Sequence, residues 1–172
     1  MTPMGSHTAR YASVCAMWYA LNKNEWYKNE AFENFNWATY CTSNSGFVSV
    51  GPEWAAAWFS DGYSDYIKHF MDGLAAVPEW APAGENHLLG STSIVQKINY
   101  DTKMITYRTF LPSSTEILRL VNSPKQITVD GKTLKRVDDF TNEEGWKWEK
   151  LKEGGTLHIN HLNGKNVEII IH

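Results

Sequence analysis

The sequence has few of the features that mark membrane, nucleic-acid-binding or disulfide-rich proteins. Its 172 residues contain two cysteines and a net charge of −3, and lysine and arginine form no cluster. Its apolar stretches are far shorter than the roughly 18 residues that a membrane-spanning helix needs. We therefore expect neither a membrane nor a nucleic acid as a partner.

Patterns typical of metal, cofactor and nucleophile sites are missing as well. Cys15 and Cys41 are too few and too far apart for a zinc motif or a disulfide framework, so we expect two buried free thiols. There is no phosphate-binding glycine loop, no Gly-x-Ser-x-Gly motif and no His-Glu-x-x-His motif. The sequence therefore indicates no metal and no cofactor, and it identifies no catalytic residue.

Aromatic residues, by contrast, are abundant and unevenly placed. Residues 1–86 contain 17 of the 23 aromatic residues and carry a net charge of −5, whereas residues 87–172 carry +2. The spacing of apolar positions changes at the same place from a helical period to the alternation of strands. We predict an α+β fold in two segments, a helical segment over residues 1–86 and a small antiparallel β-sandwich over residues 87–172.

Three helices are expected in the first segment. The first has an apolar face at helical spacing, with Ser6 or Thr8 as its cap and an end at residues 22–24. The second covers about residues 25–40, and the third begins at Ser60 or Asp61 and ends before Pro78. The apolar residues expected on these helices are Tyr11, Val14, Cys15, Trp18 and Leu21, then Tyr27, Ala31, Phe32, Phe35 and Ala38, then Tyr63, Tyr66, Ile67, Phe70 and Leu74.

These aromatic faces are too wide for three helices to cover one another. Helices that are apolar on more than one side are normally buried between neighbours. We therefore expect part of the packing surface to come from further helices or from a second copy of the chain. A homo-oligomer through exposed helix faces is one outcome of this expectation.

Short alternating segments separated by turn residues follow the helices. The Asp130-Gly131 and Asn163-Gly164 pairs are typical of tight turns between antiparallel strands. Seven strands are predicted, over residues 92–99, 104–110, 115–121, 126–129, 146–151, 156–161 and 167–171.

The segment 51–66 contains the most informative group of side chains. Sugars are bound by flat aromatic rings, which cover their C–H faces, and by carboxylates, which accept from their hydroxyl groups. We predict a carbohydrate-binding site formed by Glu53, Trp54, Trp58, Asp61 and Tyr63. Two other interpretations stay open, namely that Asp61 only caps a helix and that the tryptophans belong to the core. Glu53 and Asp61 are also the natural candidates for a glycosidase acid and base.

Several stretches resemble a known family. They are Phe35-Asn36-Trp37-Ala38-Thr39-Tyr40, residues 58–66, Pro78-Glu79-Trp80-Ala81-Pro82, residues 87–93 and Val129-Asp130-Gly131-Lys132. With the order of the two segments, they resemble the C-terminal part of bacterial six-hairpin, or α/α-toroid, glycosidase-like proteins, in which helical hairpins are followed by a β-sandwich.

The resemblance implies a glycan-related function, with an oligosaccharide or polysaccharide as the partner and a periplasmic or secreted parent protein. A full toroid contains many more helices than the three expected here. We therefore interpret the chain as a C-terminal fragment of a glycoside hydrolase or polysaccharide lyase, not catalytically complete by itself. The alternative is a non-catalytic structural or glycan-binding module.

Overall fold

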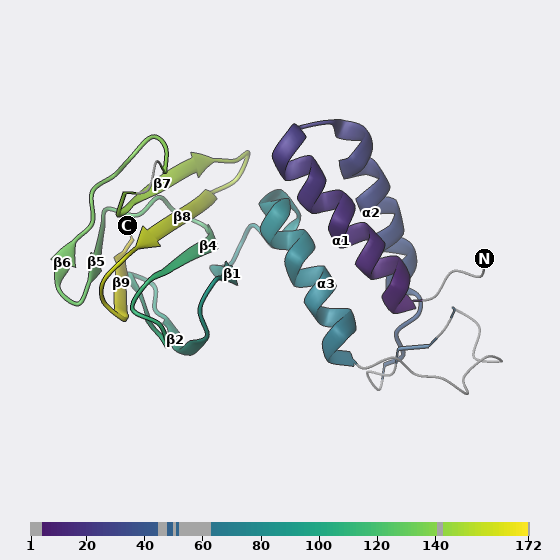
Figure 1. Ribbon diagram of the computed structural model, residues 1–172, viewed down its shortest axis with the longest axis horizontal. Coiled ribbons are helices and arrows are strands. Elements are labelled where there is room, and N and C mark those ends of the chain that lie inside the picture. The colour runs from purple at the N-terminus through teal and green to yellow at the C-terminus, as the bar shows by residue number, and fades with distance from the viewer. Residues whose placement is uncertain (1–4, 45–47, 50, 52–62, 141–142, 172) are drawn as a thin grey trace. The chain divides into compact units, whose positions relative to one another are not determined.

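Three helices followed by two antiparallel sheets make up the described part of this protein, as the change in apolar spacing predicts (Figure 1). The structure is a computed structural model that describes residues 5–44, 48–49, 51, 63–140 and 143–171. The chain divides into two compact units, Met1–Val77 and Pro78–His172, which we call the helical unit and the β unit. The α+β fold class is confirmed.

The helices are α1 (Gly5–Asn22), α2 (Glu25–Thr39) and α3 (Tyr63–Ala76), and a 3-10 turn, η2 (Pro78–Trp80), follows. The end of α1 lies where it was predicted. Lys23 adopts a left-handed conformation with φ of 57° and donates its N–H to the Tyr19 carbonyl, which closes the helix. Asn24 then caps α2 by accepting from the Trp26 N–H at 3.0 Å. Ser6 and Thr8 both lie inside α1, so the prediction that one of them is its cap was wrong.

The apolar face predicted for the first helix is also wrong. Of its five residues only Cys15 is buried, and the others are exposed on the outside of α1. The helix packs on α2 and α3 through a stripe of small residues, whose narrow side chains let the helices approach closely. The buried residues are Gly5, Ser6, Ala9, Ala12, Ser13, Cys15 and Ala16. The apolar periodicity of α1 therefore comes from large residues on its outer face. The residues on its packing face are too small to produce such a pattern.

The faces predicted for α2 and α3 are largely confirmed. Ala31, Phe35 and Ala38 are buried on α2, although Phe32 is exposed. On α3, Tyr66 is buried and Phe70 is half-buried, whereas Ile67 is exposed, contrary to the prediction. The Phe70 ring lies 4.7 Å from that of Phe35.

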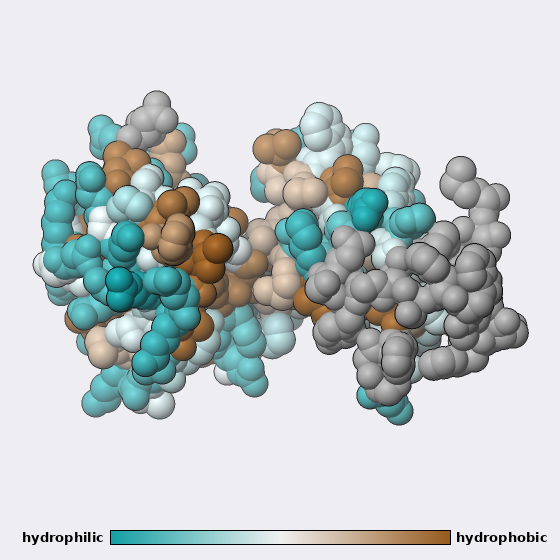
Figure 2. Space-filling view, turned by 60° about the horizontal axis from the view of Figure 1, so that its bottom comes forward, coloured by the Kyte–Doolittle hydropathy of each residue, from teal (hydrophilic) through white to brown (hydrophobic). Residues whose placement is uncertain are grey.

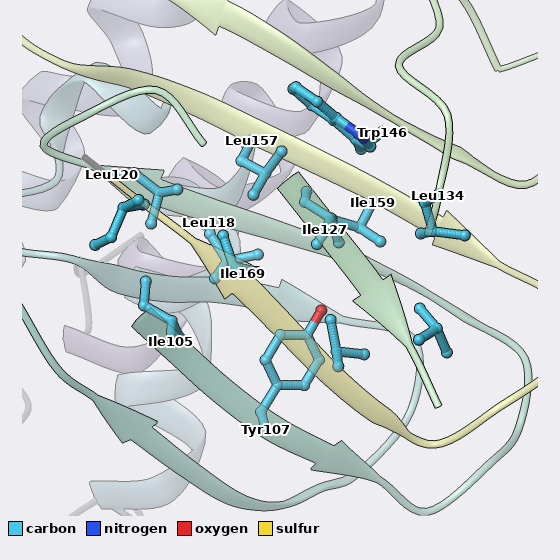
Figure 3. Packing of buried hydrophobic residues seen from close by; sticks show 13 residues of the cluster. Ile105, Tyr107, Leu118, Leu120, Ile127, Leu134, Trp146, Leu157, Ile159 and Ile169 are labelled. Carbon is cyan, nitrogen blue, oxygen red and sulfur yellow. The ribbon is translucent and has the colours of Figure 1, made fainter. Parts of the chain in front are cut away.

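The β unit contains nine strands in two sheets. They are β1 (His87–Ser91), β2 (Val95–Tyr100), β3 (Met104–Thr109), β4 (Ser114–Leu120), β5 (Gln126–Val129), β6 (Lys132–Thr133), β7 (Gly145–Lys150), β8 (Gly155–His161) and β9 (Asn166–Ile170). One sheet has the order β1-β4-β8-β7 and the other the order β2-β3-β9-β5-β6, with all pairs antiparallel. Residues from both sheets fill one apolar core, as in a β-sandwich (Figure 3).

Two of these strands were not predicted. The pairing of β1 with β4 shifts its register between Leu88 and Gly90, and such an irregularity obscures the alternation that marks a strand. β6 has only two residues, which pair with β5 across the Asp130-Gly131 turn. Both turn residues have positive φ, 46° and 81°, as the Asp-Gly pair predicts. The Asn163-Gly164 turn instead connects β8 to β9, which belong to different sheets.

Close packing between α3 and α2 predicts the effect of one small substitution. A Cβ atom at Gly73 would lie 2.5 Å from the buried ring of Phe35. We expect Gly73→Ala to lower the free energy of unfolding by about 1–3 kcal/mol through overpacking, although alanine favours a helix by about 1 kcal/mol. Urea unfolding followed by helical circular dichroism measures this.

Gly51→Ala is the matched control in the helical unit, because no atom of the described residues lies within 4 Å of a Cβ built there. It should change stability by less than about 0.5 kcal/mol. Phe35→Leu should recover part of the loss in the Gly73→Ala background. A Gly73→Ala protein as stable as the parent chain would contradict the packing described for this contact.

Candidate functional site

The residues predicted to bind carbohydrate fall almost entirely outside the described part of the chain. Glu53, Trp54, Trp58 and Asp61 lie between residues 52 and 62, which the structure does not describe. Tyr63 is the first residue of α3, and its side chain is likewise not described. The site therefore stays a prediction.

The described residues on either side of this segment are anchored in the helical unit. Before it, Thr42 and Val48 form an antiparallel bridge, and the Ser49 N–H donates to the Cys41 carbonyl at 2.7 Å. After it, the Tyr66 hydroxyl donates to the Ala38 carbonyl at 2.6 Å in a buried hydrogen bond. The chain before the predicted site and the chain after it are thus both hydrogen-bonded to residues at the end of α2.

A buried histidine lies among polar groups of the helical unit. His69 is 6 % exposed, and its Nε2 is 3.4 Å from the Nε of Arg10 while its Nδ1 is 3.3 Å from the Ser13 hydroxyl. Because Arg10 can only donate, Nε2 accepts and Nδ1 carries the proton. The Ser13 hydroxyl donates a hydrogen bond to the Arg10 carbonyl at 2.8 Å. This chain of hydrogen bonds connects α3 to α1.

The β unit contains a larger buried group of polar side chains, which we call the Glu116 cluster. Its members are Ser91, Tyr107, Ser114, Glu116 and His161. Glu116 and His161 are fully buried. The Glu116 carboxylate accepts from Ser114 at 2.6 Å, from Ser91 at 3.1 Å and from Tyr107 at 3.1 Å. Tyr107 belongs to the five-stranded sheet and Glu116 to the four-stranded one, so their hydrogen bond joins the two sheets.

His161 completes the cluster from the end of β8. Its Nε2 lies 3.0 Å from the Ser114 hydroxyl and 3.4 Å from Oε2 of Glu116, and its Nδ1 lies 3.1 Å from the Pro112 carbonyl oxygen. Burial alone would raise the pKa of Glu116. The hydrogen bonds from His161, Ser114 and Tyr107 outweigh burial, so the pKa of Glu116 is lowered.

Serine, histidine and glutamate are the residue types of a nucleophilic triad, but their arrangement differs from one. In a triad the carboxylate accepts a hydrogen bond from the histidine Nδ1–H, and the serine hydroxyl faces a substrate. Here Nδ1 faces Pro112, the serine proton goes to Glu116, and Ser114 is only 4 % exposed. The cluster holds strands together and offers no access to a substrate.

Arg119 lies on the other side of β4 from Glu116, as strand alternation predicts for residues three apart. It is 2 % exposed, and its guanidinium donates to the carbonyls of Leu120, Glu153 and Gly155. These bonds hold the turn between β7 and β8 against β4.

A cavity adjoins Arg119. Its volume is about 160 Å³, and Glu79, Ala83, Arg119, Leu151, Lys152 and Glu153 line it. Pockets that enclose small ligands usually measure about 300–1,000 Å³, so this cavity has room for a few water molecules and not for an oligosaccharide.

Neither metal ligation nor thiol chemistry finds support in the described residues. Among them, no three histidines, cysteines or acids gather as metal ligands would. Cys15 and Cys41 are free and buried, as predicted, and burial raises the pKa of both thiols, which keeps them protonated.

His161 and Glu116 were not identified from the sequence as important residues. A signal for His161 was nevertheless present, because it continues the alternating positions of Leu157 and Ile159 toward the core. Glu116 similarly shares the inward face of β4 with Leu118 and Leu120. A polar residue in an apolar alternation needs a buried partner, and that partner is distant in the sequence.

No protein-family model matches the chain, and no curated protein matches it. Within the part of the chain that the structure describes, every helix is too short or too polar to cross a membrane.

The Glu116 cluster predicts a large loss of stability from a nearly isosteric change. Glu116→Gln removes the negative charge and half of the acceptors that satisfy Tyr107, Ser91, Ser114 and His161. We expect the free energy of unfolding of the β unit to fall by about 3 kcal/mol. Urea unfolding followed by NMR signals of β-unit amides measures this without interference from the helices.

Glu143→Gln is the control for the loss of a carboxylate, because Glu143 is exposed. It should change stability by less than about 0.5 kcal/mol. Equal effects of the two substitutions would show that the cluster contributes nothing specific to the fold.

Proposed function

We propose that this chain is the C-terminal part of a bacterial carbohydrate-active protein of the six-hairpin type, a periplasmic or secreted glycoside hydrolase or polysaccharide lyase in its full form. By itself the chain is not catalytically complete. The observation that carries this proposal is the outward-facing apolar stripe of α1, together with the sequence resemblance.

That outer stripe consists of Tyr11, Val14, Trp18 and Leu21, which recur at intervals of three and four residues. Their exposed fractions range from 46 % for Tyr11 to 77 % for Leu21. Apolar residues lie on the surface of the helical unit (Figure 2). A helix with small residues toward its neighbours and large apolar residues on its outer side fits a position between two layers of helices. Further helical hairpins of a toroid would supply the second layer.

A sugar ligand fits the composition of the segment that precedes α3. Trp54, Trp58 and Tyr63 supply ring faces, and Glu53 and Asp61 supply carboxylates for the hydroxyl groups of an oligosaccharide or polysaccharide. The anchoring of the chain on both sides, at Ser49 and Tyr66, supports a fixed position for the ends of this segment.

A second candidate function is a non-catalytic structural or glycan-binding module. The sealed Glu116 cluster and the small size of the cavity at Arg119 favour it, because neither gives an acid–base pair access to a substrate. The two candidates differ in whether the chain acts with further helical hairpins or alone.

Binding to a glycan array tests the carbohydrate partner. We expect the 172-residue chain to bind a subset of oligosaccharides, and Trp58→Ala and Asp61→Ala each to reduce that binding at least tenfold, because they remove a stacking surface and a hydroxyl acceptor. Trp26→Ala and Asp138→Ala are the matched controls, since both residues are exposed elsewhere on the chain. Equal losses in all four variants, or no binding by a folded sample, would contradict the site.

The outer stripe of α1 also predicts that isolated chains associate. In the absence of covering helices, apolar faces of this kind bury one another. We expect light scattering to detect a homo-oligomer whose mass increases with concentration, and Trp18→Lys and Leu21→Lys to return it to the monomer. Ile94→Lys, which changes an equally exposed apolar residue of the β unit, should have no effect. A monomer at every concentration would contradict this prediction.

A further inference from the structure

The hydrogen-bond partners of His161 determine how many protons its ring carries. The Nδ1 atom faces the carbonyl oxygen of Pro112 at 3.1 Å. A carbonyl oxygen can only accept, so Nδ1 must donate and therefore carries a proton. Any proton on Nε2 is then the second on the ring and makes it an imidazolium.

The Nε2 atom also faces acceptors. Ser114 lies 3.0 Å away, but its single hydroxyl proton is engaged in the shorter 2.6 Å bond to Glu116, which leaves an oxygen lone pair directed at Nε2. The second neighbour is the Glu116 carboxylate at 3.4 Å. Without a proton on Nε2, the lone pairs of Nε2, the Ser114 oxygen and the Glu116 carboxylate would face one another inside a core that excludes water.

We propose that the folded β unit holds one proton in the Glu116 cluster, as an imidazolium at His161 paired with the Glu116 carboxylate, at pH values where an unfolded histidine is neutral, and that this proton locks the two sheets. A neutral arrangement, with the proton moved through Ser114 to Glu116, would contain the same number of protons. The hydroxyls of Tyr107 and Ser91 both donate to Glu116, and donors stabilise the carboxylate form.

The polar and charged groups that surround the cluster favour a positive charge on the imidazole. β4 contributes Glu116, β3 contributes Tyr107, β1 contributes Ser91, and Glu144 adds a negative charge from the chain before β7. Burial alone would lower the pKa of His161. The hydrogen bond and charge of Glu116, with smaller effects from Pro112 and Glu144, outweigh burial and raise it. Burial and the Glu116 charge raise the pKa of Tyr107 well above 10, so that hydroxyl remains a donor.

The pKa shifts of His161 and Glu116 on folding define the pH range in which their ion pair stabilises the β unit. Because the pKa of His161 is raised on folding, its contribution to stability is complete below about pH 6.5 and is lost as the pH rises through the folded pKa. Because the pKa of Glu116 is lowered on folding, its contribution is complete above about pH 4.5 and is lost as the pH falls through the folded pKa. The combined contribution of this pair to the stability of the β unit is therefore greatest between these two pH values and falls as the pH rises through the folded pKa of His161.

NMR of the 172-residue chain tests the charge directly. Long-range ¹H–¹⁵N spectra distinguish an imidazolium, in which both ring nitrogens carry protons, from either neutral tautomer. We expect His161 to remain an imidazolium at pH 7.5. His158, half-buried on the same strand, provides a second β-unit histidine in the same spectra. A neutral His161 ring at pH 7.5 would overturn the proposal.

Stability as a function of pH tests the lock. We expect the folding equilibrium constant of the β unit to fall up to tenfold per pH unit above about pH 6.5. The double variant Glu116→Gln/His161→Gln should lose this dependence. Glu149→Gln/His158→Gln should keep it, because that pair on the same sheet is half-exposed, with 3.8 Å between His158 Nε2 and Glu149 Oε2.

Equal pH dependence in the parent chain and the buried double variant would overturn the lock. If that variant does not fold, the pH dependence of hydrogen exchange in the parent chain decides. Exchange corrected for its intrinsic rate should increase above pH 7 first in residues 107–116 and 159–166, which surround the cluster. Residues 150–156, at the opposite end of β8, are the reference. An equal increase of hydrogen exchange in all three ranges would contradict the proposal that the proton holds the two sheets together.

Discussion

The fully buried carboxylate of Glu116 imposes the strictest constraint on the β unit. A carboxylate without water must receive hydrogen bonds and a counter-charge from the protein, because an unpaired buried charge costs several kcal/mol. Its donors come from β1, β3, β4 and β8. One residue therefore fixes the register of strands in both sheets, since a shift of a single residue would turn each donor to the other face.

Apolar residues fill the rest of the interior of the sandwich. Ile105, Leu118 and Ile159 lie in the apolar core of the sandwich, and Trp146 joins the same core from β7 (Figure 3). Apolar burial supplies most of the stabilisation, at roughly 1.5–3 kcal/mol for each large side chain. It specifies alignment less strictly, because similar apolar residues can replace one another in the same space. The polar cluster therefore contributes mainly to the uniqueness of the fold.

The sequence predicted the fold class and most strands because alternation and turn residues are local signals. Ile105, Tyr107 and Thr109, for example, occupy alternate positions of β3, and all three are buried. The packing face of α1 was not predictable in the same way, since alanine and serine contribute little to an apolar period. The partnership of Glu116 with His161 depends on tertiary contact between distant strands, so no local pattern reveals it. Four of the five residues expected to bind sugar lie in the segment 52–62, which the structure does not describe, and the side chain of the fifth, Tyr63, is not described either.

The sequence separation within the cluster has a consequence for synthesis. Ser114 and His161 are 47 positions apart, and the intervening chain forms β5, β6 and β7. When β4 has left the ribosome, Glu116 has therefore been made but His161, its charged partner, has not. Until β8 emerges, Glu116 remains better solvated by water than by protein, which opposes early closure of the sandwich. The cluster, which joins the two sheets, is therefore complete only once β8 has been made.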